Sequence, residues 1–521
     1  MARLGFLALA ASAVLVLGAC TANPQPAPSS TDTGVPVVTP SGESTPTEPG
    51  LPPVAEPLAL KDIVTFSGVA MMNAGSNCTG TLIDTGVPTG PAYILTNGHC
   101  TGDVGRPAQS TTLAEEWFGT ATFLAAKGNE DNHLVVDVVG LEYSTMRHTD
   151  TAIVRLKPTL GELTALGIKP IPLAKEEPDE GATVTNIGVP VQDLMPEDWV
   201  LRRGECTLGA QQTLIEFLWT WFGVWSNDCP GIIQGSSGSP LLSLGADGAP
   251  TSVVGMINTT TGGSSAAVGG ACFLNRPCEV TADGPVMREN TSYAQSVAGI
   301  GACFDQQGKF AVGGECPLPT SSIWAAAGGG SFRGSGEGNA FGESPSARFV
   351  GRSEGSMRSA LVPIGDATAC QKPDTYSGAT TQPLPLAGEP WELHGQVVTA
   401  DLPAEEGFYL LCAVSGDDYS GAAGVLFEVD RTPPILPVGA DVEDLGGGAM
   451  LVQPHLNPPE ISTVRFKWGP KDATDCTDTS SFQDFLVVPL VLEPKDLPAT
   501  YCIYGMDAAG NRTEVKKIDI P

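Results

Sequence analysis

The stretch "IIQGSSGSPLLS", residues 232–243, combines the marks of a β-strand with those of a sharp turn. Apolar pairs stand near its two ends, yet seven of its twelve residues are Gly, Ser or Pro. A flexible linker would not need apolar residues at its edges. A tight turn that presents a hydroxyl and bare backbone N–H groups would need both, because glycine lets the backbone bend sharply and approach other groups closely. The stretch therefore predicts a turn of this kind.

The chain around this turn reads as a series of short strands. Between about Leu60 and Leu318, apolar runs such as "IVTFSGVAMM", "CTGTLI", "AYILTN" and "TAIVRL" are separated by turn-rich breaks. With 63 Gly and 44 Pro among 521 residues, the composition favours short strands over long helices, and the chain is too long for one core. We therefore predict an all-β protein of several domains, built from barrels or sandwiches.

Three motifs in this region resemble those of one enzyme family. "GSSGSP", residues 235–240, resembles the "G-D-S-G-G-P" turn of chymotrypsin-like serine proteases, in the "G-x-S-G-S-P" form of many bacterial members. "YILTNGHC", residues 93–100, resembles "L-T-A-A-H-C", and "HTDTAIVRL", residues 148–156, resembles "D-I-A-L-L-x-L". Their order, His then Asp then Ser, is not that of subtilisins or α/β-hydrolases. The resemblance implies a chymotrypsin-like double β-barrel, a trypsin-like serine protease domain over residues 60–318.

The resemblance also implies the catalytic residues. Ser237 is the expected nucleophile, His99 the general base, and Asp150 a buried carboxylate that orients the imidazole. The backbone N–H groups of Gly235 and Ser237 are the expected oxyanion hole. The implied activity is that of a serine endopeptidase that acts on protein or peptide substrates.

Other interpretations of these motifs remain open. A Ser/Gly hairpin turn, or a histidine packed near a disulfide, has a similar local sequence. Asp137 in "VVDVV" competes with Asp150, and His133 and His148 are further candidates for the base. The alternative function is a catalytically inactive, protease-like surface protein for binding or adhesion. The filled triad positions favour the enzyme.

Further positions bear on substrate specificity. "VVGMINTTTG", residues 253–262, resembles the family's strand beside the substrate, although a plain core strand would look similar. By this resemblance the substrate-binding residues are Asn258, Thr259 and Thr260. Trypsin-like members carry an acid six residues before the nucleophile, where this chain has Gly231, so we expect a neutral, small or apolar preference there.

The residue before the nucleophile departs from the family pattern. It is Ser236, where the family usually has an Asp that pairs with a newly cut N-terminus in zymogen-activated members. We therefore expect a preformed oxyanion hole.

An aromatic segment lies upstream of the turn. "LIEFLWTWFGVW", residues 214–225, contains five aromatic residues. It predicts either a well-packed strand pair or an exposed aromatic edge that grips substrate or lipid headgroups. Trp219, Trp221 and Trp225 are the positions that distinguish the two.

The N-terminus reads as an export signal. Arg3 precedes an apolar run from Leu4 to Ala19, too short for a comfortable membrane span. The run ends in "LGAC", which resembles the lipobox of bacterial lipoproteins and implies a signal peptide over residues 1–19 and acylation of Cys20, although an ordinary cleavage site with an incidental cysteine has the same look. Residues 20–59 are rich in Pro, Ser and Thr and predict a disordered tether. We expect an exported lipoprotein, held by this anchor at the outer membrane or cell surface.

The cysteines predict disulfide bonds. The chain has 13, and without Cys20 an even number remains, as expected for an exported protein. Pairing of sequence neighbours is one of many connectivities, and it gives Cys78–Cys100, Cys206–Cys229, Cys272–Cys278, Cys303–Cys316, Cys370–Cys412 and Cys476–Cys502. Only five histidines are present and no C-x-x-C pair stands opposite another, so we expect no metal and no other cofactor.

The C-terminal part contains an internal repeat. "DATACQKPDTYS", residues 366–377, resembles "DATDCTDTSSFQ", residues 472–483. We predict a linker over residues 319–357, followed by two immunoglobulin-like or fibronectin-III-like β-sandwich modules, 358–430 and 431–521. A cell-surface or matrix molecule is the expected ligand of these modules. The net charge of −31 argues against nucleic-acid binding, and we expect a monomer.

Overall fold

Strands make up most of the regular structure in the computed structural model. The described residues are 55–102, 111–216, 219–262, 272, 275–281, 284–320, 322–328, 330–332, 344–388, 395–435, 438–455, 461, 463–484 and 490–521. The predicted signal peptide, Cys20 and nearly all of the predicted tether lie outside these residues. None of the described helices has the length and apolar character needed to span a membrane.

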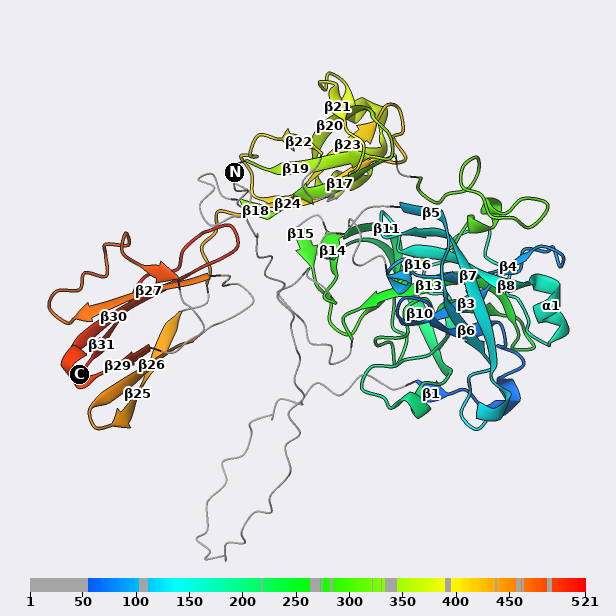
Figure 1. Ribbon diagram of the computed structural model, residues 1–521, viewed down its shortest axis with the longest axis horizontal. Helices are drawn as coiled ribbons and strands as arrows, with labels where there is room; N and C mark the ends of the chain where they lie inside the picture. The colour runs from blue at the N-terminus through cyan, green and yellow to red at the C-terminus, as the bar shows by residue number, and fades with distance from the viewer. Residues whose placement is uncertain are drawn as a thin grey trace, which may run out of the picture. The chain divides into compact units, whose positions relative to one another are not determined.

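The first β-barrel is closed because its last two strands along the chain pair with each other (Figure 1). Its strands are β2 (Val69–Asn73), β3 (Asn77–Leu82), β4 (Pro91–Thr96), β5 (Thr111–Glu115), β6 (Gly119–Phe123), β7 (Leu134–Thr145) and β8 (Thr151–Thr159). The order β7-β6-β2-β3-β4-β8 becomes a ring through the β7–β8 pairing, and β5 lies at the edge on β7. Helix α1 (Leu160–Ala165) follows, begun by a capping box between Thr159 and Glu162.

The second β-barrel closes in the same way. Its strands are β1 (Glu56–Pro57), β9 (Thr183–Gly188), β10 (Arg202–Glu216), β11 (Trp219–Asn227), β12 (Pro240–Leu244), β13 (Pro250–Thr260), β14 (Cys278–Thr281), β15 (Gly284–Val286) and β16 (Ser292–Ser296). The order β11-β16-β13-β12-β9-β10 becomes a ring through the β10–β11 pairing. The predicted all-β, chymotrypsin-like double barrel is thereby confirmed. Residues 56–58, predicted as tether, instead pair with β10 and bury Leu58.

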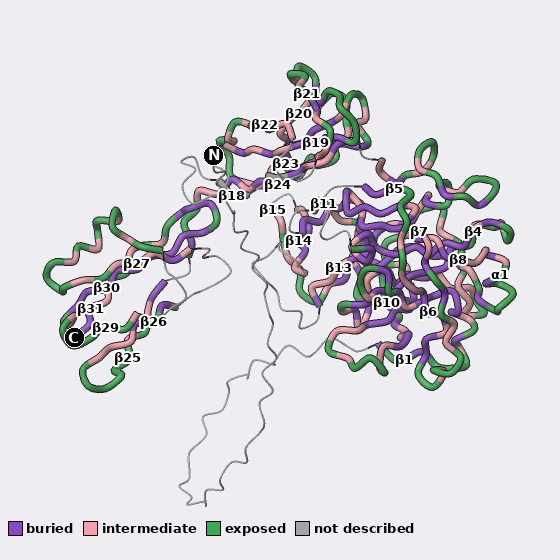
Figure 2. Tube along the Cα trace, viewed as in Figure 1, coloured by how far each residue is buried: buried purple, intermediate pink, exposed green. Residues whose placement is uncertain are grey.

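The apolar residues of each barrel alternate toward its interior, as period-2 strands require. Figure 2 shows the buried positions concentrated inside the two barrels. One core cluster contains residues of both barrels, among them Tyr93, Ile153, Ile187 and Leu242. The two barrels therefore pack against each other through a common apolar core.

The disulfides follow the predicted neighbour pairing. All six pairs are bonded: Cys78–Cys100, Cys206–Cys229, Cys272–Cys278, Cys303–Cys316, Cys370–Cys412 and Cys476–Cys502. The loops between them span 6 to 42 residues in sequence. In the chain-entropy description, bridges of this kind stabilise by about 3 kcal/mol each for a loop of about 15 residues.

Two smaller units of paired sheets follow the double barrel. The first has sheets β17-β19-β22 and β18-β24-β23-β20-β21, and the second has sheets β25-β26-β29 and β28-β27-β30-β31. Their bounds are β17 (Ile323–Gly328), β18 (Gly330–Phe332), β19 (Ser346–Gly351), β20 (Gly355–Pro363), β21 (Gln382–Leu384), β22 (Gln396–Thr399), β23 (Gly407–Ser415), β24 (Ala423–Val429), β25 (Gly439–Gly446), β26 (Ala449–His455), β27 (Thr463–Pro470), β28 (Gln483–Asp484), β29 (Leu490–Leu492), β30 (Ala499–Met506) and β31 (Lys516–Ile520). Each unit has an apolar core with residues from both of its sheets, as in a β-sandwich. Their immunoglobulin-like character stays a prediction.

The predicted linker over residues 319–357 needs correction. It contains β17, β18, β19 and the start of β20, so the first sandwich begins well before residue 358. Ile323, Ala347 and Phe349 are fully or almost fully buried in the core of that sandwich. The Gly-rich composition between these strands concealed their apolar alternation.

The loop between β7 and β8 is tied to the first sandwich by a buried arginine. Arg147 has no exposed surface, and its Nε and Nη1 donate to the carbonyls of Ala422 at 3.1 Å and Ile323 at 2.6 Å. Burial lowers the pKa of Arg147 to about 10, against the raising effect of Asp418. Arg147 therefore links the loop that leads to Asp150 to two backbone carbonyl groups of the first sandwich.

We expect Arg147→Met to lower the free energy of unfolding by about 3 kcal/mol, because two buried carbonyls lose their donors. Urea unfolding followed by tryptophan fluorescence measures this. The control is Arg155→Met, whose half-exposed guanidinium pairs with Glu142 at 2.7 Å and is worth about 0–1 kcal/mol. Equal losses in the two variants would show that the buried contact adds nothing.

Candidate active site

His99 and Asp150 come together because β4 and β8 are neighbours in the first barrel. His99 begins a short 3₁₀ turn, His99–Thr101, after β4, and Asp150 directly precedes β8. The pairing of Thr96 with Ala152 fixes the two strand ends side by side. The Cys78–Cys100 disulfide holds the histidine turn against β3.

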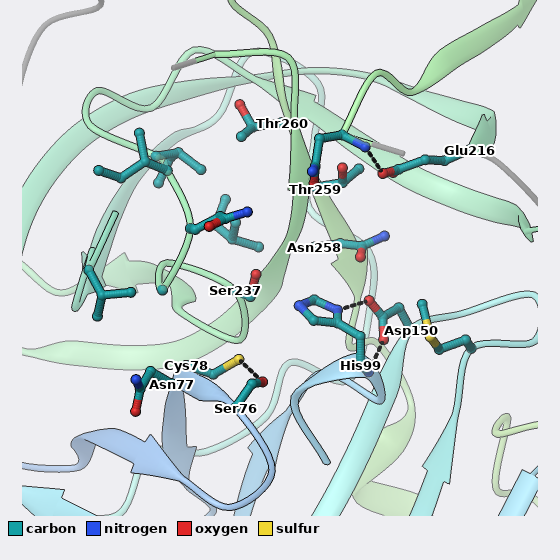
Figure 3. A pocket seen from close by; sticks show the side chains of 18 of the residues that line it. Ser76, Asn77, Cys78, His99, Asp150, Glu216, Ser237, Asn258, Thr259 and Thr260 are labelled. Carbon is teal, nitrogen blue, oxygen red and sulfur yellow. Dashed lines mark hydrogen bonds and ion pairs between the residues drawn. The ribbon is translucent and has the colours of Figure 1, made fainter. Parts of the chain in front are cut away.

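The imidazole is oriented by the buried carboxylate. His99 Nδ1 lies 2.6 Å from Asp150 Oδ2, and the backbone N–H of His99 donates to Asp150 Oδ1 at 3.0 Å. Both carboxylate oxygens are thus engaged, and Asp150 is fully buried. The His99 side chain remains 24% exposed, and its other ring nitrogen faces Ser237 in the cleft (Figure 3).

Opposing effects set the basicity of His99. Burial lowers its pKa, whereas the charge of Asp150, the hydrogen bond to Asp150 and the charge of Glu216 raise it. The raising effects prevail, so the pKa of His99 lies above the ordinary 6.5. The protonated form is therefore stabilised where it stands, as a general base requires once it has taken a proton.

The turn that contains Ser237 requires glycine at two positions, one on each side of the serine. Gly235 and Gly238 have φ values of +97° and +81°. A Cβ on Gly238 would lie 2.1 Å from the carbonyl oxygen of Thr79, and one on Gly235 would lie 2.7 Å from that of Val189. These close approaches explain the glycines of the opening motif.

Hydrogen bonds between residues of the Ser237 turn hold its shape. Ser236 is buried; its N–H donates to the carbonyl of Ile233 at 3.0 Å, and its hydroxyl accepts from the N–H of Ile233 at 3.4 Å. Within the described residues, the N–H groups of Gly235 and Ser237 donate to no protein acceptor. Both residues line the cleft, so these donors are available to a bound group.

The cleft between the barrels has a volume of about 440 Å³. His99, Asp150, Gly235 and Ser237 line it, as do the predicted substrate-binding residues Asn258, Thr259 and Thr260. The structure thus brings these sequence-predicted positions to one site. Asn258 is also buried, with its amide atoms lacking hydrogen-bond partners among the described residues.

Gly231 does not take the position predicted for it. It is not among the described residues that line the cleft, and a Cβ on it would lie 2.4 Å from the backbone nitrogen of Ala55. Gly231 faces the N-terminal segment because the chain turns there, with φ of +71°. Ile232, Ile233 and Gln234 line the cleft in its place.

The competing residues lie elsewhere. Asp137 is exposed on β7 and pairs with Lys157 at 3.2 Å. His148 is half-buried, and its desolvation and the charge of Arg147 lower its pKa to about 3. Neither these two nor His133 lines the cleft within the described part of the chain.

The three tryptophans of the aromatic segment lie in a packed strand pair rather than at an exposed edge, and Phe217 lies outside the described residues. Trp219, Trp221 and Trp225 are all buried on β11. Trp225 packs in the core of the second barrel and donates to Glu177 at 3.0 Å. The exposed-edge interpretation is therefore wrong, although Trp219 and Trp221 do line the cleft.

Glu216 is a charged cleft residue that sequence reasoning missed. It ends β10, and its Oε1 accepts from the N–H of Asn275 at 2.7 Å (Figure 3). The only signal in the sequence is a single acid within an aromatic run, "LIEFLWTW". From the sequence alone, such a residue cannot be distinguished from a charged residue exposed to solvent at the end of a strand.

Among the described residues, one cluster of side chains of the kinds that bind metal ions lies beside the site. Atoms of Cys78, His99 and Cys100 lie within 4.8 Å of one another. The two cysteines are joined in a disulfide and offer no thiolate, so the donor set does not suit a metal ion.

Comparison with known proteins agrees with this fold. Residues 78–275 match the family model described as "Trypsin-like peptidase domain", a span that includes His99, Asp150 and Ser237. The matched span contains strands of both barrels, so the double barrel is similar to a trypsin-like peptidase domain.

Two solved structures are also similar to part of this chain. A thermostable serine protease from an extremophilic microorganism is similar at 14% identity, with a TM-score of 0.30, over 46% of this chain and 94% of its own. An inactivated protease paralogue of the scabies mite is similar at 17% identity, with a TM-score of 0.29, over 47% of this chain and 93% of its own. No curated protein matches the sequence.

We expect Asp150→Asn to lower the pKa of His99, because the main raising effects are lost while burial remains. An NMR titration of the ring protons measures this, since the chain has only five histidines to assign. Asp137→Asn, which removes an exposed carboxylate, should leave the titration unchanged. An unshifted His99 in Asp150→Asn would contradict the assigned pairing.

Proposed function

We propose that the protein is a serine endopeptidase that hydrolyses peptide bonds through His99, Asp150 and Ser237. The observation that carries the proposal is the buried Asp150 carboxylate 2.6 Å from His99 Nδ1, with the opposite edge of the ring turned toward Ser237 in the cleft. This arrangement suits nucleophilic catalysis, in which a base must reach the hydroxyl while a third group orients the base. The match to the trypsin-like peptidase domain supports the same reaction.

In the proposed reaction, Ser237 Oγ attacks the carbonyl carbon of the scissile bond while His99 Nε2 takes its proton. Asp150 stabilises the resulting imidazolium. The N–H groups of Gly235 and Ser237 donate to the oxygen that becomes negative in the tetrahedral intermediate. His99 then returns the proton to the leaving amine, and water hydrolyses the acyl-enzyme by the same steps.

The proposal includes export and a lipid anchor. The "LGAC" motif supports acylation of Cys20, and the Pro-, Ser- and Thr-rich segment after it supports a tether. Disulfides throughout the described chain suit an oxidising compartment outside the cytoplasm. We propose that the sandwich units face cell-surface or matrix ligands.

We expect Ser237→Ala to abolish both peptide cleavage and labelling by a fluorophosphonate, with the thermal midpoint nearly unchanged. His99→Ala should lose about 10⁴-fold in kcat, as in other triads. His133→Ala is the matched control and should keep full activity. A folded wild-type protein that refuses the label would favour the alternative of an inactive surface-binding protein.

We expect Cys20→Ala to move the exported protein from the detergent phase to the aqueous phase in a phase-partition assay. Acyl chains bind membranes by burying methylene groups, each worth about 0.8 kcal/mol, and the variant has no acylation site. Peptide cleavage should be unaffected, because the site lies in the double barrel. Equal partition of the two proteins would refute the anchor.

A further inference from the structure

A carboxylate is buried in one wall of the cleft, and one of its oxygens has no partner within the described part of the chain. Glu216 is 3% exposed and ends β10 where it meets the cleft. Its Oε1 accepts from the N–H of Asn275 at 2.7 Å, whereas Oε2 has no hydrogen-bond partner among the described residues. Burying a carboxylate without a full set of partners is costly, so this oxygen is suited to a group that enters from outside.

The charges around Glu216 do not neutralise it. Burial raises its pKa to about 7, against lowering effects from Thr259, Asn275 and His99, and Asp150 raises it further. Across the described residues, no Lys or Arg forms an ion pair with it. As far as the structure describes the chain, the carboxylate thus lacks a permanent cation.

A second buried glutamate in the same barrel shows the contrast. Glu279 on β14 is 2% exposed, but Arg288 lies 2.5 Å away and the hydroxyl of Tyr293 donates to it at 3.2 Å. Among the residues described, the fold therefore supplies a counterion to Glu279, which does not line the cleft, and none to Glu216, which does.

Two tryptophans stand beside Glu216 on the same wall. The rings of Trp219 and Trp221 are nearly parallel, 6° apart in plane with centroids 5.9 Å apart, and both line the cleft. Aromatic faces bind both the apolar stem and the cationic head of a lysine or arginine side chain. The cleft is also lined by Ile232, Ile233 and Gln234, which carry no charge.

We propose that Glu216, Trp219 and Trp221 form a subsite for a lysine or arginine side chain of the substrate. The inference rests on the proposed function for the statement that the ligand is a peptide. The net charge of −31 favours the approach of cationic peptides over acidic ones. The basic residue is thus recognised on the Glu216 wall, while the part of the cleft lined by Ile232 and Ile233 takes a neutral one.

Binding without turnover tests the subsite separately from catalysis. The protein is the full chain with Ser237→Ala, and the probes are hexapeptides that carry arginine or its neutral analogue citrulline at one position at a time. At one position, calorimetry should show the arginine peptide binding at least tenfold more tightly at pH 8. Adding Glu216→Gln should reduce this ratio to within twofold, while Glu279→Gln should leave it intact.

The pH dependence provides a readout that a purely structural role would not move. Glu216 ionises as pH rises through about 7, so the arginine-to-citrulline ratio should increase between pH 6 and pH 8. His99 and Asp150 are the other charged groups that act on it, and any pH dependence that persists in Glu216→Gln is assigned to His99. In the wild-type enzyme, the same position should show the preference in kcat/KM.

The outcomes separate the two proposals. An arginine preference in the Ser237→Ala protein, without cleavage or labelling of the wild type, keeps the subsite and overturns the endopeptidase. Cleavage with no basic preference at any position overturns the subsite alone. If Glu216→Gln does not fold, the wild-type preference and its rise with pH still decide, because their absence refutes the subsite.

Discussion

The fully buried carboxylate of Asp150 is the constraint on which the site depends. A charge without access to water must be hydrogen-bonded by the protein, and both oxygens of Asp150 are bonded by His99, through its ring and its backbone N–H. This requires a turn of one particular shape directly after β4, and a strand β8 that begins directly after Asp150. The β4–β8 pairing and the Cys78–Cys100 bridge supply those two conditions.

The other half of the site is joined to the first by Thr79 of β3. Its N–H donates to the carbonyl of Ser237 at 2.8 Å, and its hydroxyl donates to that of Gly235 at 3.0 Å and accepts from the N–H of Val189 at 2.9 Å. One buried threonine of the first barrel thereby fixes the Ser237 turn of the second. The absence of a side chain at Gly238 permits this approach, so the glycine allows the Ser237 turn to contact β3 of the first barrel.

Sequence reasoning succeeded where a local pattern determines the outcome. The strands were predictable from alternating apolar residues, and His99, Asp150 and Ser237 from motifs at strand ends that the fold brings to one cleft. The same reasoning failed for Gly231, because the direction in which a turn faces depends on what packs against it, here Ala55. It also missed Glu216, which reaches the cleft only through the pairing of β10 with β11. The strands within the predicted linker were hidden by glycines around a few buried residues such as Phe349.

In the proposed mechanism, Glu216 connects the recognition of a substrate side chain to the basicity of His99. Its charge raises the pKa of His99, and His99 in turn lowers that of Glu216, so the two groups favour each other's charged forms. A lysine or arginine side chain paired with Glu216 would offset that negative charge. The pKa of His99 would then fall toward the value set by burial and Asp150, which favours the neutral imidazole that accepts the serine proton. In the proposed reaction, a basic substrate therefore lowers the pKa of His99 when it binds. A neutral substrate leaves His99 more strongly protonated at the same pH.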